Sequence, residues 1–280
     1  MSKLSEYRRG KDFLVCVDSD GCAMDTMDIK HMRCVGPCMV AEWGLEAWAD
    51  EILARWNDIN LYTMTRGINR FKGLSMALKE INEKYIAIEG IEELTDWAER
   101  SPELSNPALE RAIAGTGSAV LQKALSWSKA VNAAIGALPD SEKLPYEGVR
   151  EALMFAHERA DIAIVSSANA EAVLEEWRRF DLLPHTDVVC AQDVGSKAFC
   201  IAELLKAGYA PDHVLMCGDA PGDLDAARKN GVFYYPIRVR HEKESWREFV
   251  DEALDHLLSG TYGGAYQAEK IAAFLENLGG

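Results

Sequence analysis

The stretch Phe13-Leu-Val-Cys-Val-Asp18-Ser-Asp20-Gly21-Cys-Ala-Met-Asp25 decides how this chain folds. Its apolar run, followed by a glycine, predicts a buried strand that ends in two carboxylates. Because alternate residues of an extended backbone point the same way, Asp18 and Asp20 share one side of the chain. Two like charges that close repel each other, and a divalent cation or a bound proton is the usual remedy. The structural alternative is a solvated acidic turn.

The rest of the chain predicts the sheet to which this strand belongs. From Tyr146 onward, helical segments alternate with short apolar strands at residues 162–166, 188–191, 214–218 and 233–237. Such alternation predicts a parallel sheet with right-handed crossovers. Residues 22–160, in contrast, are mainly helical in pattern, with helices expected at 42–57, 70–85, 90–100, 108–114 and 118–138.

These patterns predict an α/β fold with a Rossmann-like parallel sheet core, an inserted all-helical cap domain and a C-terminal helical extension. The expected segments are 1–24 with the first strand, 25–158 as the helical cap, 159–245 as the remainder of the sheet, and 246–280 as the extension, with helices at 246–258 and 267–278. Since the helical domain is inserted directly after the first strand, we expect it to cover the carboxyl edge of the sheet like a lid.

Composition limits the partners that this chain is expected to have. Its 45 acidic and 30 basic residues give a formal charge of −15, which repels nucleic acid and anionic membrane surfaces. No apolar run approaches the ~18 residues of a membrane span. Residues 1–11 are polar and charged, unlike a secretion signal, so we expect a cytoplasmic protein.

The seven cysteines are an odd number, and three of them lie in or beside predicted buried strands, which favours reduced, packed thiols. His31, Cys34 and Cys38 could share a helix face as zinc ligands. A fourth ligand is not evident, however, and Gly36-Pro37 is expected to break the helix between them.

A second polar group follows the predicted strand at 162–166. Ser166 comes directly after the apolar run, and Ser167 and Asn169 precede a helix. Ser167 or Asn169 could simply cap that helix. The functional interpretation is that a hydroxyl and a backbone N–H meet a phosphoryl oxygen, with Ser166 as the better candidate and Ser167 and Asn169 as further substrate contacts.

Two more candidate groups follow along the chain. Lys197 opens a helix, where a lysine opposes the helix dipole but can meet an anion, although a solvated surface lysine is the ordinary alternative. The run Val214-Leu-Met-Cys-Gly218-Asp219-Ala-Pro-Gly222-Asp223 predicts a buried strand ending in Gly-Asp-x-x-x-Asp. Those carboxylates are hard oxygen ligands suited to Mg²⁺, and an ordinary acidic turn is the alternative.

These four groups, in this order, resemble the four motifs of the haloacid dehalogenase-like phosphohydrolase superfamily. The resemblance covers about residues 11–25 and 160–240 and includes the place at which a helical cap is inserted. It does not extend to the details of the cap or the C-terminal extension. One departure is Cys22, where members of the superfamily more often have threonine, and its side chain is not expected to take part in the chemistry.

The resemblance implies a Mg²⁺-dependent phosphatase acting on a small phosphorylated metabolite. Asp18 would attack phosphorus and form an aspartyl-phosphate, and Asp20 would act as general acid and base. Ser166 and Lys197 would stabilise the transferring phosphoryl oxygens. Mg²⁺ would be held by a set of four residues, with Asp20 contributing its backbone carbonyl: Asp18, Asp20, Asp219 and Asp223.

Other activities stay open at this point. Asp20 argues against dehalogenases and phosphonate-cleaving members, which lack an acid at that position. A phosphomutase keeps the same residues, so sequence does not exclude one. A catalytically silent binding module on this fold is the remaining alternative, and loss of a motif residue would favour it.

A basic segment inside the predicted cap contrasts with the acidic chain. No acidic residue occurs between Asp58 and Glu80, and the segment contains four candidate substrate-binding residues: Arg66, Asn69, Arg70 and Lys72. These side chains could hold the non-reacting part of a substrate, with Arg70 binding a carboxylate or second phosphate. The structural alternative is that the cations pair with acidic helices around residues 89–103.

Overall fold

The computed structural model describes residues 4–280, so the first three residues of the predicted segment 1–24 lie outside the described residues. The chain forms two compact units. We call Met1–Met27 together with Asp140–Gly280 the core unit, and Asp28–Pro139 the helical unit.

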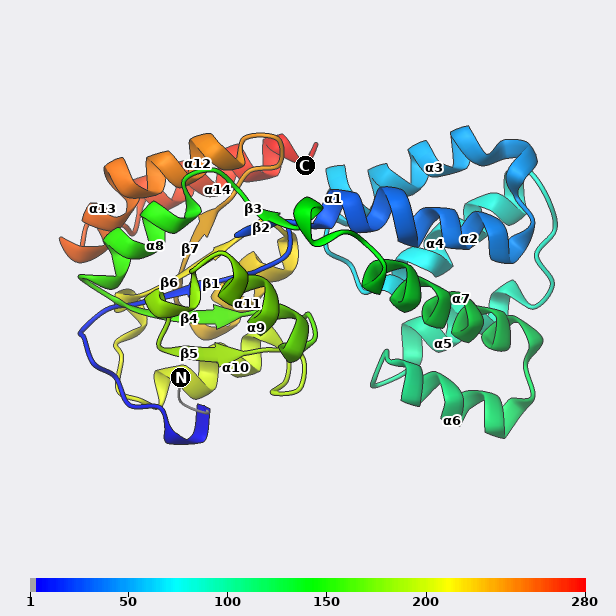
Figure 1. Cartoon of the computed structure of the whole chain (residues 1–280), viewed down its shortest axis with the longest axis horizontal. Helices are drawn as coiled ribbons and strands as arrows, with labels where there is room; N and C mark the ends of the chain where they lie inside the picture. Colours follow the sequence, from blue (N-terminus) through cyan, green and yellow to red (C-terminus); the bar gives the residue numbers. More distant parts are fainter. Residues whose placement is uncertain (1–3) are drawn as a thin grey trace. The chain divides into compact units, whose positions relative to one another are not determined.

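The core unit contains a five-stranded parallel sheet (Figure 1). In spatial order its strands are β5 (Val188–Cys190), β4 (Asp161–Val165), β1 (Leu14–Val17), β6 (Val214–Gly218) and β7 (Phe233–Pro236). The predicted α/β class with a Rossmann-like parallel sheet is confirmed. The first strand lies in the middle, because β1 pairs with both β4 and β6. Asp18, the residue after β1, therefore lies at the carboxyl edge of the sheet between the ends of β4 and β6.

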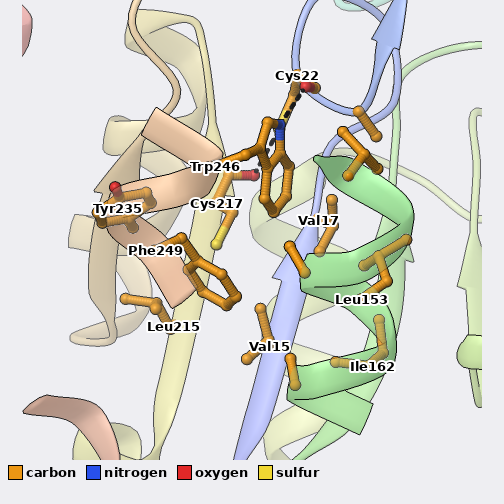
Figure 2. Packing of buried hydrophobic residues seen from close by; sticks show 14 of the residues in the cluster. Val15, Val17, Cys22, Leu153, Ile162, Leu215, Cys217, Tyr235, Trp246 and Phe249 are labelled. Carbon is orange, nitrogen blue, oxygen red and sulfur yellow. Dashed lines mark hydrogen bonds between the residues drawn. The ribbon is translucent and has the colours of Figure 1, made fainter. Parts of the chain in front are cut away.

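Strand alternation divides the core side chains between the two faces of the sheet. On one face, Val15 and Val17 pack with Leu153 of α8 (Val149–His157) and with Phe249, as Figure 2 shows. This face is covered by helices that include α9 (Ala170–Arg179), α12 (Glu242–Glu248), the π-helical turn η8 (Phe249–Ala253) and α13 (Leu254–Leu258). The reversal of strand order after β5 places α10 (Lys197–Leu205) and α11 (Pro221–Asn230) on the opposite face.

The predicted C-terminal helices cover the open edge of the sheet. In the edge strand β7, Tyr234 N donates to Gln267 Oε1 at 3.0 Å, and Tyr234 O accepts from the Tyr262 hydroxyl at 2.8 Å. Gln267 lies in α14 (Ala265–Asn277), whose Phe274 contacts the Tyr234 ring at a centroid distance of 5.4 Å. The side chains of Gln267 and Tyr262 thus hydrogen-bond to the N–H and C=O of Tyr234, which an exposed edge strand would offer to another strand.

The helical unit is built around buried aromatic rings. Trp127 lies within 6.3 Å of Trp56 and 6.1 Å of Phe71, and Phe71 meets Trp97 edge-on at 5.2 Å, all measured between ring centroids. The helices predicted at 70–85, 90–100, 108–114 and 118–138 are confirmed as α4 (Arg70–Lys84), α5 (Ile91–Arg100), α6 (Asn106–Thr116) and α7 (Ala119–Gly136).

The predicted single helix at 42–57 is wrong. The helix α2 (Gly36–Trp43) ends at Gly44, which adopts a left-handed conformation with φ of 66°. A short 3₁₀ turn (Glu46–Trp48) follows, and α3 (Ala49–Asn57) then begins. Glycine reaches this conformation without a steric penalty, so it ends the helix although the apolar spacing continues.

The predicted helix break at Gly36-Pro37 is also wrong. Helical backbone continues from α1 (Met27–Lys30) through the π-helical turn η2 (His31–Val35) into α2. Gly36 N–H bonds to His31 O, so the hydrogen-bond ladder has shifted by one residue just before the proline. A Cβ at Gly36 would lie 2.7 Å from Leu53 Cδ2, which shows how closely α2 approaches α3.

Two features at the junction of the units differ from the predicted segments. The helix α8 belongs to the core unit because Ala152 and Leu153 pack onto the sheet. The prediction that residues 140–158 are part of the cap is therefore wrong. A short antiparallel pair, β2 (Met24–Asp25) with β3 (Leu144–Pro145), was not predicted. Pairs this short carry too little periodicity to be recognised in a sequence.

Candidate active site

Three carboxylates meet at the carboxyl edge of the sheet. Asp18 follows β1, and its N–H continues the ladder to Cys217 O at 3.0 Å. Asp219 follows β6, and Asp223 lies in the first turn of α11. One oxygen from each of these three aspartates lies within 4.8 Å of the others, and all three residues are buried. Sheet pairing therefore brings together residues that are two hundred positions apart in the sequence.

Lys197 joins this cluster from the first residue of α10. Its Nζ lies 2.7 Å from Asp18 Oδ2 and 2.6 Å from Asp223 Oδ1. Burial lowers the pKa of the Lys197 ammonium, but the two carboxylates outweigh that effect and raise its pKa above the ordinary value. The lysine is thus held as a cation, and the surface-lysine alternative does not apply.

The cluster has an excess of negative charge. Burial raises the pKa of Asp18 well above its ordinary value; Lys197 opposes this rise, while Asp223 and Asp219 add to it. When all four groups are ionised, three carboxylates face one ammonium. A divalent cation offsets such an excess, and an all-oxygen set of carboxylates suits Mg²⁺. The residues present therefore fit a magnesium site.

Within the cluster, Asp223 is held by its own surroundings. Its Oδ1 accepts from Lys197, and its Oδ2 accepts from Ala220 N at 3.1 Å. A Cβ at Gly218 would lie 2.3 Å from Asp223 Cγ, so this carboxylate occupies the space that the glycine leaves open. Both oxygens of Asp223 are thus engaged by groups of the core unit, those of Lys197 and Ala220.

Asp20 lies in a tight loop after β1. Its Oδ1 accepts from Thr26 Oγ1 at 2.6 Å. The Ser19 carbonyl accepts three backbone N–H groups at 2.8 to 3.3 Å, from Cys22, Ala23 and Met24. Gly21, with φ of 82°, allows the reversal. The second carboxylate of the opening motif is therefore held by a hydrogen-bonded turn.

The predicted Ser166 group divides into three different environments. Ser166 is buried beyond the end of β4, where its N–H donates to Cys190 O at 2.9 Å and its Oγ accepts from Ala168 N at 3.1 Å. The register of β4 against β1 places it at the same edge as Asp18. Ser167 is exposed. Asn169 caps α9, because its Oδ1 accepts from the backbone N–H groups of Glu171 and Ala172. The predicted capping alternative is confirmed for this oxygen.

Sequence comparison matches part of the chain to a known protein family. The profile of haloacid dehalogenase-like hydrolases matches residues 97–236, which is half of the chain. The chain belongs to the haloacid dehalogenase-like hydrolase family. The matched part includes Ser166, Lys197, Asp219 and Asp223, while Asp18 lies upstream of it. No curated protein matches the sequence.

Several solved structures are similar to the chain over most of its length at low sequence identity. A haloacid dehalogenase-like hydrolase from Streptococcus pneumoniae is 12% identical with a TM-score of 0.46, covering 84% of this chain and 90% of that one. A subfamily IA hydrolase from Geobacter sulfurreducens is 16% identical with a TM-score of 0.40, covering 81% and 88%. A β-phosphoglucomutase candidate from Thermotoga maritima is 19% identical with a TM-score of 0.48, covering 80% and 84%. Similarity at this level does not bear on substrate or reaction.

The basic segment of the helical unit is mainly structural. The Arg66 side chain is completely buried; its Nη1 donates to Leu61 O at 2.7 Å and lies 4.0 Å from Asp28 Oδ1. Asn69 caps α4 by accepting from Phe71 N at 2.9 Å. The interpretation of Arg66 as a substrate contact is therefore wrong in this structure, because its guanidinium is enclosed by the unit itself.

Arg70 and Lys72 have different surroundings. Arg70 Nη1 donates to Asn132 Oδ1 at 2.7 Å and reaches Ser128 Oγ at 3.4 Å, and both partners are neutral. Burial lowers the pKa of the Arg70 guanidinium. Lys72 is exposed. The contacts of Arg66 with Leu61 and Asp28, and those of Arg70 with Ser128 and Asn132, thus lie outside the acidic helices around residues 89–103 that the alternative names.

The described residues also bear on two expectations, those for a zinc site and for a membrane span. Among residues 4–280, the metal-ligating side chains that come together are those of Asp18, Asp219 and Asp223; the set of His31, Cys34 and Cys38 is not among them. None of the described helices is long and apolar enough to cross a membrane.

Proposed function

We propose that this hydrolase is a Mg²⁺-dependent phosphatase that cleaves a small phosphorylated metabolite through an aspartyl-phosphate. The observation that carries the proposal is the buried contact of Lys197 with Asp18 and Asp223, beside Asp219. An ammonium and a divalent cation together would neutralise both the nucleophilic carboxylate and the anionic phosphoryl group that it must approach. Bound Mg²⁺ would supply part of that charge stabilisation.

The first step transfers the phosphoryl group to the protein. An Asp18 oxygen forms a bond to phosphorus, the bond between phosphorus and the ester oxygen breaks, and Asp20 gives its proton to the leaving oxygen. Lys197 stabilises the phosphoryl oxygens through its charge, and Ser166 through hydrogen bonds. Asp18, the Asp20 carbonyl and Asp219 would hold the metal, with Asp223 orienting its surroundings.

The second step releases phosphate. Asp20, now a carboxylate, takes a proton from water while the water oxygen attacks phosphorus. The bond between phosphorus and the Asp18 oxygen breaks, so inorganic phosphate leaves and both carboxyl groups return to their starting states. The presence of Asp20 supports an ester substrate, because an alkoxide leaving group needs this proton.

For the helical unit, we propose that Arg70 binds an anionic substituent of the substrate. Within residues 4–280, its guanidinium donates through Nη1 to the neutral side chains of Ser128 and Asn132. A partly desolvated cation without a counter-charge is stabilised by an incoming anion, and the edge formed by Nε and Nη2 can bind a carboxylate or phosphate bidentately.

The first experiment measures phosphate release from a panel of phosphorylated metabolites with Mg²⁺, using Asp18→Asn as the matched inactive variant. We expect turnover by the wild type and none by folded Asp18→Asn, as checked by circular dichroism. Transfer of the phosphoryl group between hydroxyls of one sugar phosphate, without phosphate release, would identify a mutase instead. Absence of any turnover, or appreciable turnover by Asp18→Asn, would refute the proposed phosphatase mechanism.

The role of Arg70 is tested on the best substrate from that panel. Arg70→Ala should lower kcat/KM by roughly 10- to 1000-fold, the scale of losing a charge-assisted contact, with little change for p-nitrophenyl phosphate. Lys79→Ala, which removes an exposed cation of the same helix, is the control and should change neither value appreciably. Equal losses on both substrates would remove Arg70 from the binding residues.

A further inference from the structure

The C-terminal extension reaches the loop that carries Asp20. Trp246, in α12, donates its indole N–H to the Cys22 carbonyl at 3.0 Å, as Figure 2 shows. The indole is 1% exposed, and the two residues are separated by 224 positions in the chain. Trp246 lies beyond residues 97–236, so this contact comes from a part of the chain that the family profile does not match.

A second indole holds the other side of the same loop. Trp177, in α9, donates its N–H to Ser19 Oγ at 2.9 Å and is fully buried. The two tryptophans thus contact Ser19 and Cys22, the residues immediately outside Asp20-Gly21. The Cys22 thiol adds a third contact, because its Sγ lies 3.5 Å from Cys217 O. Each of these contacts reaches the loop from a different element of the core unit.

Trp246 is held in place by contacts of its neighbouring residues and of its ring. The preceding residue, Ser245, accepts from the Tyr235 hydroxyl through its carbonyl at 2.6 Å, and its Oγ accepts from Arg238 N at 3.1 Å. The Trp246 ring meets Phe249 edge-on at a centroid distance of 5.6 Å. The helix α12 is therefore fastened to the end of β7, and the indole is fixed against the sheet before it reaches the loop.

We propose that Trp246 is a positioning residue for Asp20, so that the C-terminal extension takes part in general acid–base catalysis without touching substrate. This inference rests on the proposed phosphatase reaction. The indole N–H holds the Cys22 carbonyl, and Cys22 N–H in turn bonds to Ser19 O, which closes the turn around Asp20. Loss of the indole hydrogen bond loosens that turn, and Asp20 then spends less time where it can protonate a leaving oxygen.

The test uses Trp246→Phe, which keeps an aromatic ring but removes the N–H donor. Trp127→Phe is the matched control, because Trp127 is also fully buried and donates its indole N–H to a backbone carbonyl, that of Val35, within the helical unit. Trp177→Phe is a second test variant on the other side of the loop. All three are made in the full chain, and folding is checked by circular dichroism.

The kinetic measurement compares two leaving groups. For glycerol phosphate, whose alkoxide needs a proton, Trp246→Phe should lower kcat/KM by about tenfold, a fraction of the ~10²–10⁴-fold that general acid catalysis supplies. For p-nitrophenyl phosphate, whose leaving group departs without a proton, kcat/KM should stay within about twofold. This ratio reports only the steps up to and including the first irreversible one, the transfer of the phosphoryl group, so the later activation of water by Asp20 does not affect it. Equal losses on both esters, or no loss on glycerol phosphate, would overturn the proposal.

A second measurement does not depend on activity. Hydrogen exchange of the peptide containing Cys22, Ala23 and Met24 should be at least about fivefold faster in Trp246→Phe than in wild type, with β1 amides unchanged. Trp127→Phe should leave this peptide unaffected. If exchange is not faster, the positioning role is refuted even when the enzyme is active. If the wild type hydrolyses no phosphate ester, the proposed function fails and the assignment to catalysis fails with it, whatever the exchange shows.

Discussion

Replacing Lys197 by methionine removes the ammonium that lies between two buried carboxylates. Lys197 Nζ is 2.7 Å from Asp18 Oδ2 and 2.6 Å from Asp223 Oδ1, and the side chains of these aspartates are 8% and 0% exposed. Methionine keeps an unbranched apolar stem of similar length but has no charge. The substitution therefore isolates the electrostatic contribution of the lysine.

The expected loss is large. Removing one partner of a buried ion pair costs about 3–5 kcal/mol, because the remaining charge stays desolvated. The raised pKa of Asp18 allows that carboxyl to take up a proton and recover part of the loss. We expect the free energy of unfolding of metal-free Lys197→Met to be about 3 kcal/mol below that of wild type. Saturating Mg²⁺ should restore at least about half of it by neutralising the cluster.

Urea unfolding followed by circular dichroism, in excess EDTA and in excess Mg²⁺, measures both quantities. Lys270→Met is the matched control, because Lys270 is another largely buried lysine, paired with Glu248 in the C-terminal extension. Its loss of stability should be the same with and without Mg²⁺. Phosphate release by Lys197→Met should also fall by about 100-fold or more.

Two results would contradict this reasoning. If metal-free Lys197→Met loses less than about 1 kcal/mol, the ammonium is not needed to compensate the buried carboxylates. If Mg²⁺ stabilises wild type and variant equally, the difference between their free energies of unfolding stays unchanged. The metal then does not neutralise the carboxylates that Lys197 neutralises in the wild type.

Three further predictions concern the carboxylate cluster and the packing of the helical unit. Activity should require Mg²⁺ and be inhibited by Ca²⁺, and Asp219→Ala should weaken activation by Mg²⁺ more than Asp223→Ala does, as a Mg²⁺ titration of phosphate release would show. Because the folded-state pKa of Asp18 is raised, metal-free stability should fall as pH rises from the ordinary Asp range through that pKa; the increase in Tm caused by Mg²⁺ should therefore grow with pH. Gly36→Ala should lower the free energy of unfolding by about 1–3 kcal/mol in urea titrations, since its Cβ would lie 2.7 Å from Leu53 Cδ2.

The main features of the core could be predicted because their signals are local. An apolar run such as Val214–Gly218 followed by carboxylates marks a strand end wherever it occurs, and the carboxyl ends of parallel strands share one edge. The order of Asp18, Ser166, Lys197 and Asp219 along the chain, through its resemblance to the family's motifs, indicated one site. The structure adds the distances that join Asp18, Lys197, Asp219 and Asp223 in a cluster, and it places Ser166 at the same edge of the sheet.

Some local signals are compatible with more than one outcome. Asn169 carries the same side chain whether it caps a helix or binds a ligand, and only its position at the start of α9 shows the capping bonds. Pro37 ordinarily interrupts a helix, but the preceding π-helical turn shifts the hydrogen-bond ladder so that the helix continues. Such shifts depend on packing between helices and leave no fixed pattern in the sequence.

The chain's periodicity and charge were readable directly because they are properties of neighbouring residues: the parallel sheet, the helical insertion and the acidic strand ends all follow from them. Burial and long-range pairing are different, because they arise only when distant segments fold together. The sequence predicted Arg66 as a substrate-binding residue, but folding of the helical unit buries its side chain against Leu61 and Asp28. Trp246 had no apparent connection with Cys22, 224 residues away, until folding of the core unit brought its indole to that carbonyl.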